Sequence, residues 1–217
     1  MPLIPVDAPL EAVRQALLAR QPLLGRADTA APHREAEPPA VWREDIAGKN
    51  SCGRLRADPV ALPVLRHVVG AATAMVAETW PVDAHGDPGF LTVLGAWDVD
   101  DLKPGFYTCS PDTADTGGCR LLAGAELLPG LRERYVQAPA LLLLTGDFER
   151  IPPGADAAYG SLVSRVGALG HAIWRTALAE GLAASLFGRT SREVTGLVSR
   201  LQPGQRHLFT VALGHPA

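Results

Sequence analysis

The spacing of apolar residues predicts several amphipathic helices. In these segments apolar residues recur every three or four positions, which places them on one face of a helix. In the segment 60–78, Pro63 falls in the first turn, where a proline needs no hydrogen-bond donor. A Ser-Arg-Glu sequence that begins at Ser191 is typical of a helix cap. The predicted helices span residues 9–20, 60–78, 124–137, 161–186 and 191–201.

Shorter apolar runs predict strands between these helices. Residues 90–97, 140–146 and 207–213 have the length and apolar content of buried strands. A turn that begins at Asp101 leads into another short strand. Helices and strands interleave without the regular alternation of a doubly wound sheet. The pattern therefore predicts an α+β domain with helices packed on a central sheet.

The N-terminal part of the chain has a different composition. Residues 24–39 are rich in alanine, proline and charged residues, which is typical of a linker or of an arm that lies on another surface. We therefore divide the chain into an N-terminal helix and Pro/Ala-rich arm, residues 1–40, and a compact domain, residues 41–217.

Composition and charge exclude several functional classes. The chain has 217 residues, of which 47% are hydrophobic and 20% charged, so it can bury an ordinary core. The formal net charge of -3 and the lack of a basic run give no reason to expect a nucleic-acid partner. Because no apolar stretch approaches membrane-spanning length and no secretory signal precedes the domain, we expect a cytoplasmic protein without a membrane partner.

Few residues suggest metal or nucleophile chemistry. Three cysteines at wide spacing indicate neither a disulfide framework nor a zinc site. No two of the six histidines stand four residues apart, so a helical metal pair is excluded and we expect no metal. The glycine-rich dinucleotide motif, the P-loop, the zinc-protease motif and the nucleophile elbow are absent. Cys52 and Cys109 are interpreted as packing residues.

Three local features could carry chemistry, each with a plain structural alternative. Lys49, Ser51 and Arg54 could hold a phosphate before a helix or form a solvated turn. Tyr159 could donate or accept a proton, or pack in the core. The small-residue segment 181–188 lets a backbone approach a flat ligand, or permits a tight strand crossing.

Read together, these segments resemble the streptolysin-type (SagB-type) dehydrogenase branch of the nitroreductase superfamily. Asp-Leu-Lys-Pro-Gly-Phe-Tyr is similar to a Pro-Gly-x-Tyr stretch of that branch, and Ala-Pro-Ala-Leu-Leu-Leu-Leu-Thr-Gly-Asp-Phe-Glu-Arg to one of its strands. Tyr-Gly, a later arginine and Gly-His follow the order of its long helix. The matching segments are 101–112, 138–150, 159–171, 181–188 and 211–216, so that the resemblance covers about residues 49–216.

The resemblance implies a fold, a cofactor and a reaction. It implies a dimer with a central, mostly antiparallel sheet flanked by helices and with FMN at the subunit interface. The implied reaction oxidises thiazoline or oxazoline rings to azoles in a ribosomally made peptide, as in thiopeptide biosynthesis. Tyr159 would be the general acid or base. The residues implied to hold the cofactor are Lys49, Ser51, Arg54, Leu186, Phe187 and Gly188.

The sequence departs from the family pattern at four places. The Arg-Arg-Ser-x-Arg phosphate clamp aligns with 49–54 and keeps only part of its charge. A Pro-Ser-Ala-Gly loop aligns with 73–81 and keeps only Pro81. Ala158 stands where the family has the lysine of a catalytic Lys-Tyr pair. Trp174 and Arg175 replace a Gln-Asn pair.

These departures leave other functions open. One alternative is a flavin-free binding or assembly subunit of a peptide-modifying complex, paired with a complete homologue or with the cyclodehydratase that forms the rings. Another is a different flavin oxidoreductase, such as a cyclic dipeptide oxidase or a quinone or nitro reductase. Bound flavin separates the assembly subunit from the enzymes. No sequence feature decides between homodimer and heterodimer.

Overall fold

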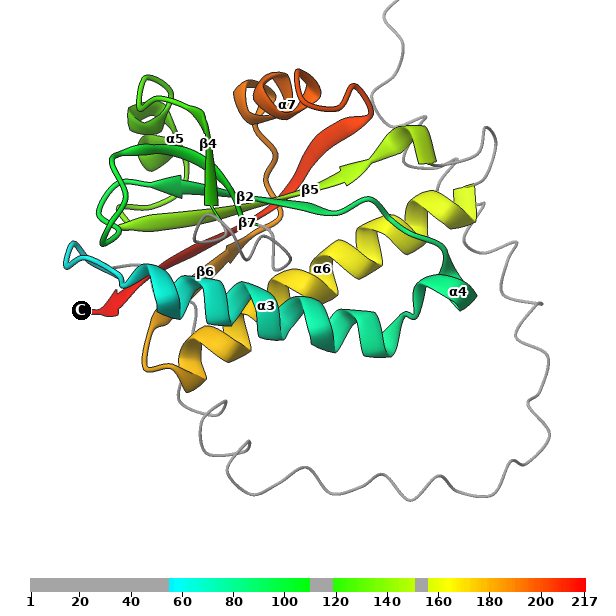
Figure 1. Ribbon diagram of the computed structural model, residues 1–217, viewed down its shortest axis with the longest axis horizontal. Helices are drawn as coiled ribbons and strands as arrows, with labels where there is room; N and C mark the ends of the chain where they lie inside the picture. The colour runs from blue at the N-terminus through cyan, green and yellow to red at the C-terminus, as the bar shows by residue number, and fades with distance from the viewer. Residues whose placement is uncertain (1–54, 110–118, 151–155) are drawn as a thin grey trace, which may run out of the picture. The chain divides into compact units, whose positions relative to one another are not determined.

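A computed structural model describes residues 55–109, 119–150 and 156–217 of the chain (Figure 1). All of them belong to one compact unit, which spans Lys49–Ala217. The segment 9–20, the Pro/Ala-rich arm and the proposed boundary at residue 41 lie outside the described residues.

A seven-stranded sheet forms the centre of this unit. The strand order is β1-β7-β5-β2-β3-β4, and β6 pairs with β7 on the side that also carries β1. Every pairing between these named strands is antiparallel. The strands are β1 Leu55–Arg56, β2 Leu91–Ala96, β3 Gly105–Cys109, β4 Cys119–Ala123, β5 Ala140–Asp147, β6 Ala183–Phe187 and β7 Gln205–Pro216.

Helices cover both faces of the sheet, as the three layers in Figure 1 show. Leu142 and Leu144 of β5 join the core that α3 and α6 cover, whereas Leu141 and Leu143 join the core under α5 and α7. Since successive side chains of a strand point to opposite faces, a strand covered on both sides must be apolar throughout. The helices are α3 Leu62–Thr79, α4 Val82–His85, α5 Leu128–Arg134, the 3-10 turn Phe148–Arg150, α6 Asp156–Ala179 and α7 Arg192–Ser199.

The predicted α+β class is confirmed by this architecture. The predicted strands 90–97, 140–146 and 207–213 correspond to β2, β5 and β7. The predicted helix 124–137 shortens to α5, and β4 was not expected.

The prediction of one helix over 161–186 was wrong in its C-terminal part. The helix α6 ends at Ala179, and residues Ala183–Phe187 form a strand instead. Gly181 has a φ of 75°, which lets the chain turn away from the helix. The N–H of Leu182 donates to the carbonyl of Ala177 and that of Gly181 to Leu178, the hydrogen-bond pair of a Schellman motif.

A buried histidine joins the start of α7 to β7. The Nδ1 atom of His207 accepts a hydrogen bond from the N–H of Ser191, the residue whose side chain caps α7, over 2.8 Å. Because a backbone N–H can only donate, Nδ1 must be unprotonated. The Nε2 atom lies 3.0 Å from the carbonyl oxygen of Phe209, which fixes the proton on that side. Burial lowers the pKa of His207 to about 4.

We expect this histidine to make the fold sensitive to acid. The unfolded chain takes up the proton near pH 6.5, whereas the folded chain takes it up only near pH 4. The contribution to stability is therefore complete above pH 6.5 and lost as the pH falls towards 4; a shift of this size corresponds to about 3 kcal/mol. Urea unfolding between pH 7 and 4 should show a shallower loss for His207→Gln than for wild type. Equal slopes for the two proteins would contradict the expectation.

Two glycines of α6 offer a matched test of packing. A Cβ on Gly170 would lie 2.6 Å from Cε1 of Phe209, whereas a Cβ on Gly167 would meet nothing within 4 Å. Gly170→Ala should lower the free energy of unfolding by about 1–3 kcal/mol, since the phenyl ring must move. Gly167→Ala should raise it by up to about 1 kcal/mol through helix propensity. Denaturant titration measures both, and equal effects would contradict the packing described.

Candidate functional site

A polar cavity of about 220 Å³ lies where the N-terminal part of α6 meets the end of β5. One wall is the segment from His85 to Pro88, which leads from α4 towards β2. Asp147 and Arg150, at the end of β5 and in the turn after it, form a second wall. The helix α6 contributes Ala158, Ser161, Leu162 and Arg165.

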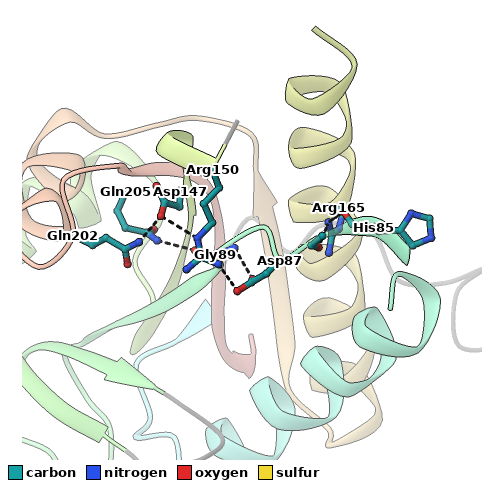
Figure 2. A network of polar contacts seen from close by, with 9 residues as sticks. His85, Asp87, Gly89, Asp147, Arg150, Arg165, Gln202 and Gln205 are labelled. Atoms are coloured by element: carbon teal, nitrogen blue, oxygen red, sulfur yellow. Dashed lines mark hydrogen bonds and ion pairs between the residues drawn. The ribbon is translucent and has the colours of Figure 1, made fainter. Parts of the chain in front are cut away.

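Asp147 fixes the geometry of the wall at β5. Its carboxylate is only 3% exposed, and Oδ1 accepts a hydrogen bond from the N–H of Glu149 over 3.0 Å. Its Oδ2 accepts from Nε of Arg150 over 3.2 Å and from the side-chain amide of Gln202. Figure 2 shows these contacts converging on one carboxylate. Because both oxygens accept hydrogen bonds from neighbouring groups, the role of Asp147 is to hold those groups in position.

The segment before β2 is fastened to the same network. The carbonyl of Gly89 accepts from Nε2 of Gln205 over 2.7 Å, and Oε1 of Gln205 accepts from the hydroxyl of Thr145 over 2.5 Å. Gly89 has a φ of 60°, and a Cβ there would lie 2.7 Å from Cβ of Asp147. Only glycine fits this approach. The cavity wall is therefore held by side chains from β5 and from β7.

Charges around the cavity are paired. Arg150 bridges Asp147 and Asp87 (Figure 2). The N–H of Gly89 donates a hydrogen bond to the carboxylate of Asp87, and this bond is the main cause of the lowered pKa of Asp87. Burial acts in the opposite direction, and the nearby Arg150 lowers the pKa further. Asp87 is therefore ionised at neutral pH and is unsuited to act as a general acid.

Arg165 ties α6 to the segment before β2. It is 5% exposed, and its Nη1 donates to the carbonyls of His85 and Gly86 over 3.2 and 3.0 Å. Its guanidinium lies 5.9 Å from the centre of the Phe90 ring. The Nε atom is buried without a hydrogen-bond partner in the described part of the chain. Burial lowers the pKa of Arg165.

Tyr159, the expected general acid or base, follows Ala158 at the edge of this cavity. Its side chain is 51% exposed, and its ring centre lies 6.0 Å from that of Phe148. The alternative interpretation, in which Tyr159 packs in the core, was therefore wrong. The hydroxyl group can be reached from solvent.

The segment expected to face a flavin ring lies elsewhere. Leu186 packs on the core shared by α3 and α6, and Phe187 on the opposite core, with its ring centre 5.4 Å from that of Tyr135. A Cβ on Gly188 would meet only Phe209, at 3.9 Å, so nothing in this chain requires a glycine there. Among the described strands β6 pairs with β7 alone, which leaves its other edge open to a ligand or partner.

Tyr159 and the end of β6 do not meet within one chain. Gly188 and Gly170 both lie beside the ring of Phe209. Tyr159 precedes Gly170 by eleven residues of α6, which corresponds to roughly 16 Å along the helix axis. The expected phosphate ligands Lys49, Ser51 and Arg54 lie outside the described residues.

Two of the family departures have visible structural consequences. Ala158 presents a methyl group to the cavity where the resembled family has a lysine. Trp174, in place of a glutamine, stacks on His171 with ring centres 5.6 Å apart and packs against the α3–α6 core. The alignment of a flavin-binding loop with 73–81 was wrong, because α3 continues to Thr79. The irregular segment lies after α4, from Gly86 to Phe90.

The described residues place no lysine at the cavity, although Arg150 and Arg165 line it. The lysines of the chain are Lys49, which is not described, and Lys103. Leu91 of β2 pairs with Thr145 near the cavity, whereas Ala96 pairs with Ala140 at the other end. Lys103 follows that far end of β2 in the chain, and the strand is roughly 17 Å long.

Sequence reasoning missed most of the cavity. The Thr-Gly-Asp-Phe-Glu-Arg sequence that ends at Arg150 and the helical Arg165 were noted as parts of a resemblance, but not as walls of one site. Gln202 and Gln205 carried no local signal, since they reach Asp147 and Thr145 only through the pairing of β5 with β7.

Solved structures identify the architecture. No family model and no curated protein matches the chain. A protein of Ralstonia eutropha JMP134 described as a nitroreductase superposes with a TM-score of 0.62 at 17% identity, over 87% of this chain and 88% of that one. One from Anabaena variabilis ATCC 29413 gives 0.57 at 18% identity, over 80% of this chain but only 38% of its own length. The chain has a nitroreductase-like fold.

A third similar structure belongs to a complex. The chain superposes on a component of the Escherichia coli microcin synthetase McbBCD complex, solved with truncated pro-MccB17 bound. The TM-score is 0.58 at 11% identity, over 100% of this chain and 84% of that one. At such identities the likeness shows the nitroreductase-like fold and does not assign an activity.

The described residues lack two kinds of feature. None of their helices is both long and apolar enough to cross a bilayer. Within the same residues, no three histidine, cysteine or acidic side chains come together as metal ligands would.

The two carboxylates that contact Arg150 provide a matched test of this site. Asp147→Asn should lower the free energy of unfolding by about 1–3 kcal/mol, because a buried amide group would then face the donors of Gln202 and Arg150. Asp87→Asn removes only a half-exposed ion pair and should cost less than about 1 kcal/mol. Denaturant titration of both variants checks the order, and a larger effect at Asp87 would contradict it.

Proposed function

We propose that the chain is a nitroreductase-fold subunit of a peptide-modifying complex that does not complete a flavin site by itself. The observation that carries this proposal is Ala158. Its methyl group lines the cavity beside Tyr159, and no described residue places a lysine there. Tyr159 and the end of β6 lie apart within one chain. A dimer with FMN at its interface would show the same separation, so the proposal rests on Ala158.

The cavity itself suits a polar partner rather than redox chemistry. Asp87 and Arg150 present charges of both signs at its rim, and Ser161 adds a hydroxyl. A peptide segment with polar or charged side chains would find partners there. The fold shared with a component of a synthetase complex solved with a pro-peptide supports this class of partner. The second subunit would be a complete dehydrogenase homologue or the cyclodehydratase of the same pathway.

A second candidate is an FMN-dependent dehydrogenase that oxidises thiazoline or oxazoline rings in such a peptide. The exposure of Tyr159, which follows the cavity-lining Ala158 in α6, favours it. The open edge of β6 could also present backbone donors to a flat ring. FMN, when bound, would accept a hydride, and Tyr159 would move a proton at its Oη atom. A second copy or a partner would have to bring the two segments together.

Turnover of a thiazoline peptide in the presence of excess FMN separates the candidates. We expect the wild-type chain alone to cause no mass loss in the peptide, because the missing general acid or base group is worth about 10²–10⁴ in rate. A labelled peptide should nevertheless bind, as measured by fluorescence anisotropy. Ala158→Lys restores the ammonium group and serves as the matched variant.

The outcomes are distinct. Oxidation by wild type that Tyr159→Phe abolishes would support the dehydrogenase and contradict the first proposal. Oxidation by Ala158→Lys but not by wild type would confirm that Ala158 is what makes the wild-type site incomplete, and would contradict the need for a different second subunit. If the wild-type chain does not bind the labelled peptide, the proposed peptide partner is contradicted.

A further inference from the structure

Two cysteines that the site does not use face each other at one side of the sheet. Cys109 ends β3 and Cys119 begins β4, and the strand register makes them direct partners. Their sulfur atoms lie 3.2 Å apart. Opposed residues of an antiparallel pair have Cα atoms about 4.5–5.5 Å apart, which lies within the range that a disulfide bond spans. A bond between the sulfurs therefore requires little movement of the backbone.

The two thiols differ in their surroundings. Cys109 is 8% exposed and lines a small apolar cavity with Phe90 and Leu169. Cys119 is partly buried at the start of the edge strand β4 and is less buried than Cys109. An oxidant in solution can therefore reach Cys119, whereas Cys109 is reached chiefly through Cys119.

The electrostatics assign the same roles. The hydrogen bond from Cys109 lowers the pKa of Cys119, against the effect of burial, and the positive charge of Arg66 on α3 lowers it further. The hydrogen bond to Cys119, followed by burial, raises the pKa of Cys109. Either sulfur can donate in this hydrogen bond, and the lowered pKa of Cys119 favours Cys109 as the S–H donor. Since the thiolate is the reactive form, Cys119 is the nucleophile of the pair.

We propose that Cys109 and Cys119 form a reactive dithiol in which Cys119 attacks hydrogen peroxide and Cys109 then closes a cross-strand disulfide. In the first step the Cys119 sulfur attacks one peroxide oxygen, the O–O bond breaks, and Cys119 becomes a sulfenic acid while water leaves after protonation. In the second step the Cys109 sulfur attacks that of Cys119, the S–O bond breaks and a second water leaves. Two thiols are oxidised by two electrons, and one peroxide is reduced to two waters.

The pair is not explained as well by the other roles of paired cysteines. In the described part of the chain no third metal-binding side chain lies near it. Packing alone would not require two sulfurs in direct register at an accessible edge. The inference does not depend on the proposed function, because neither cysteine contacts the cavity beside Tyr159.

Oxidation with hydrogen peroxide tests the dithiol in the full chain carrying Cys52→Ser. One equivalent of peroxide should remove both remaining free thiols and lower the intact mass by about 2 Da, without a covalent dimer. In the same background Cys109→Ser should accumulate a Cys119 sulfenic acid that dimedone traps. Cys119→Ser should retain a free Cys109 thiol that reacts at least about tenfold more slowly, because it is buried.

Two results would overturn the proposal. One is a pair that stays reduced in native protein under a large excess of peroxide, yet is oxidised after unfolding. The other is a Cys119 that forms only disulfides between two chains. Circular dichroism of each variant establishes that it is folded. If Cys109→Ser unfolds, Cys119→Ser still tests the proposal, because it changes one atom at a partly exposed position.

Discussion

The burial of β5 on both faces is the constraint on which the rest of the structure depends. Its eight residues are all buried, and alternate side chains enter two separate cores. Such a strand can lie only in the middle of a sheet, with a helical layer on each side. The neighbours β2 and β7 then bring the segment before β2 and the glutamines around the start of β7 to the end of β5. Asp147 stands at that end, where a buried carboxylate must be fully hydrogen-bonded, and so it gathers Arg150, Gln202 and the N–H of Glu149.

Local sequence accounts for the framework better than for the site. The apolar run of β5 and the helical spacing of α3 and α7 are properties of consecutive residues, and they were predictable. The end of α6 was missed because the apolar pattern continues into β6, and a single glycine in a left-handed conformation makes the division. The contact of Gln205 with Thr145 and the pairing of Cys109 with Cys119 depend on strand register, which no local pattern specifies. The cysteines looked widely spaced for that reason.

The chain has a nitroreductase-like fold, but Ala158 replaces a residue that the resembled family uses in catalysis. A nitroreductase-like arrangement of sheet and helices persists at sequence identities of 11 to 18% with the structures described above, because it depends on apolar patterning that many sequences satisfy. A proton-transfer site depends on individual groups. Tyr159 remains accessible, but its neighbour is a methyl group, and an indole occupies a position that the resembled family gives to an amide. These changes leave the core intact while removing polar groups that catalysis would use. A binding role within a complex is consistent with what remains.

The visible absorption spectrum of the purified, undenatured chain tests this account most directly. Flavin absorbs near 450 nm, well away from protein, and can be identified after release by heating (on the order of one FMN per chain would mark a complete site). The account predicts a colourless protein that stays colourless after incubation with excess FMN and removal of the unbound cofactor. Stoichiometric FMN bound by the chain alone would contradict it, and would show that two copies of this chain complete the site.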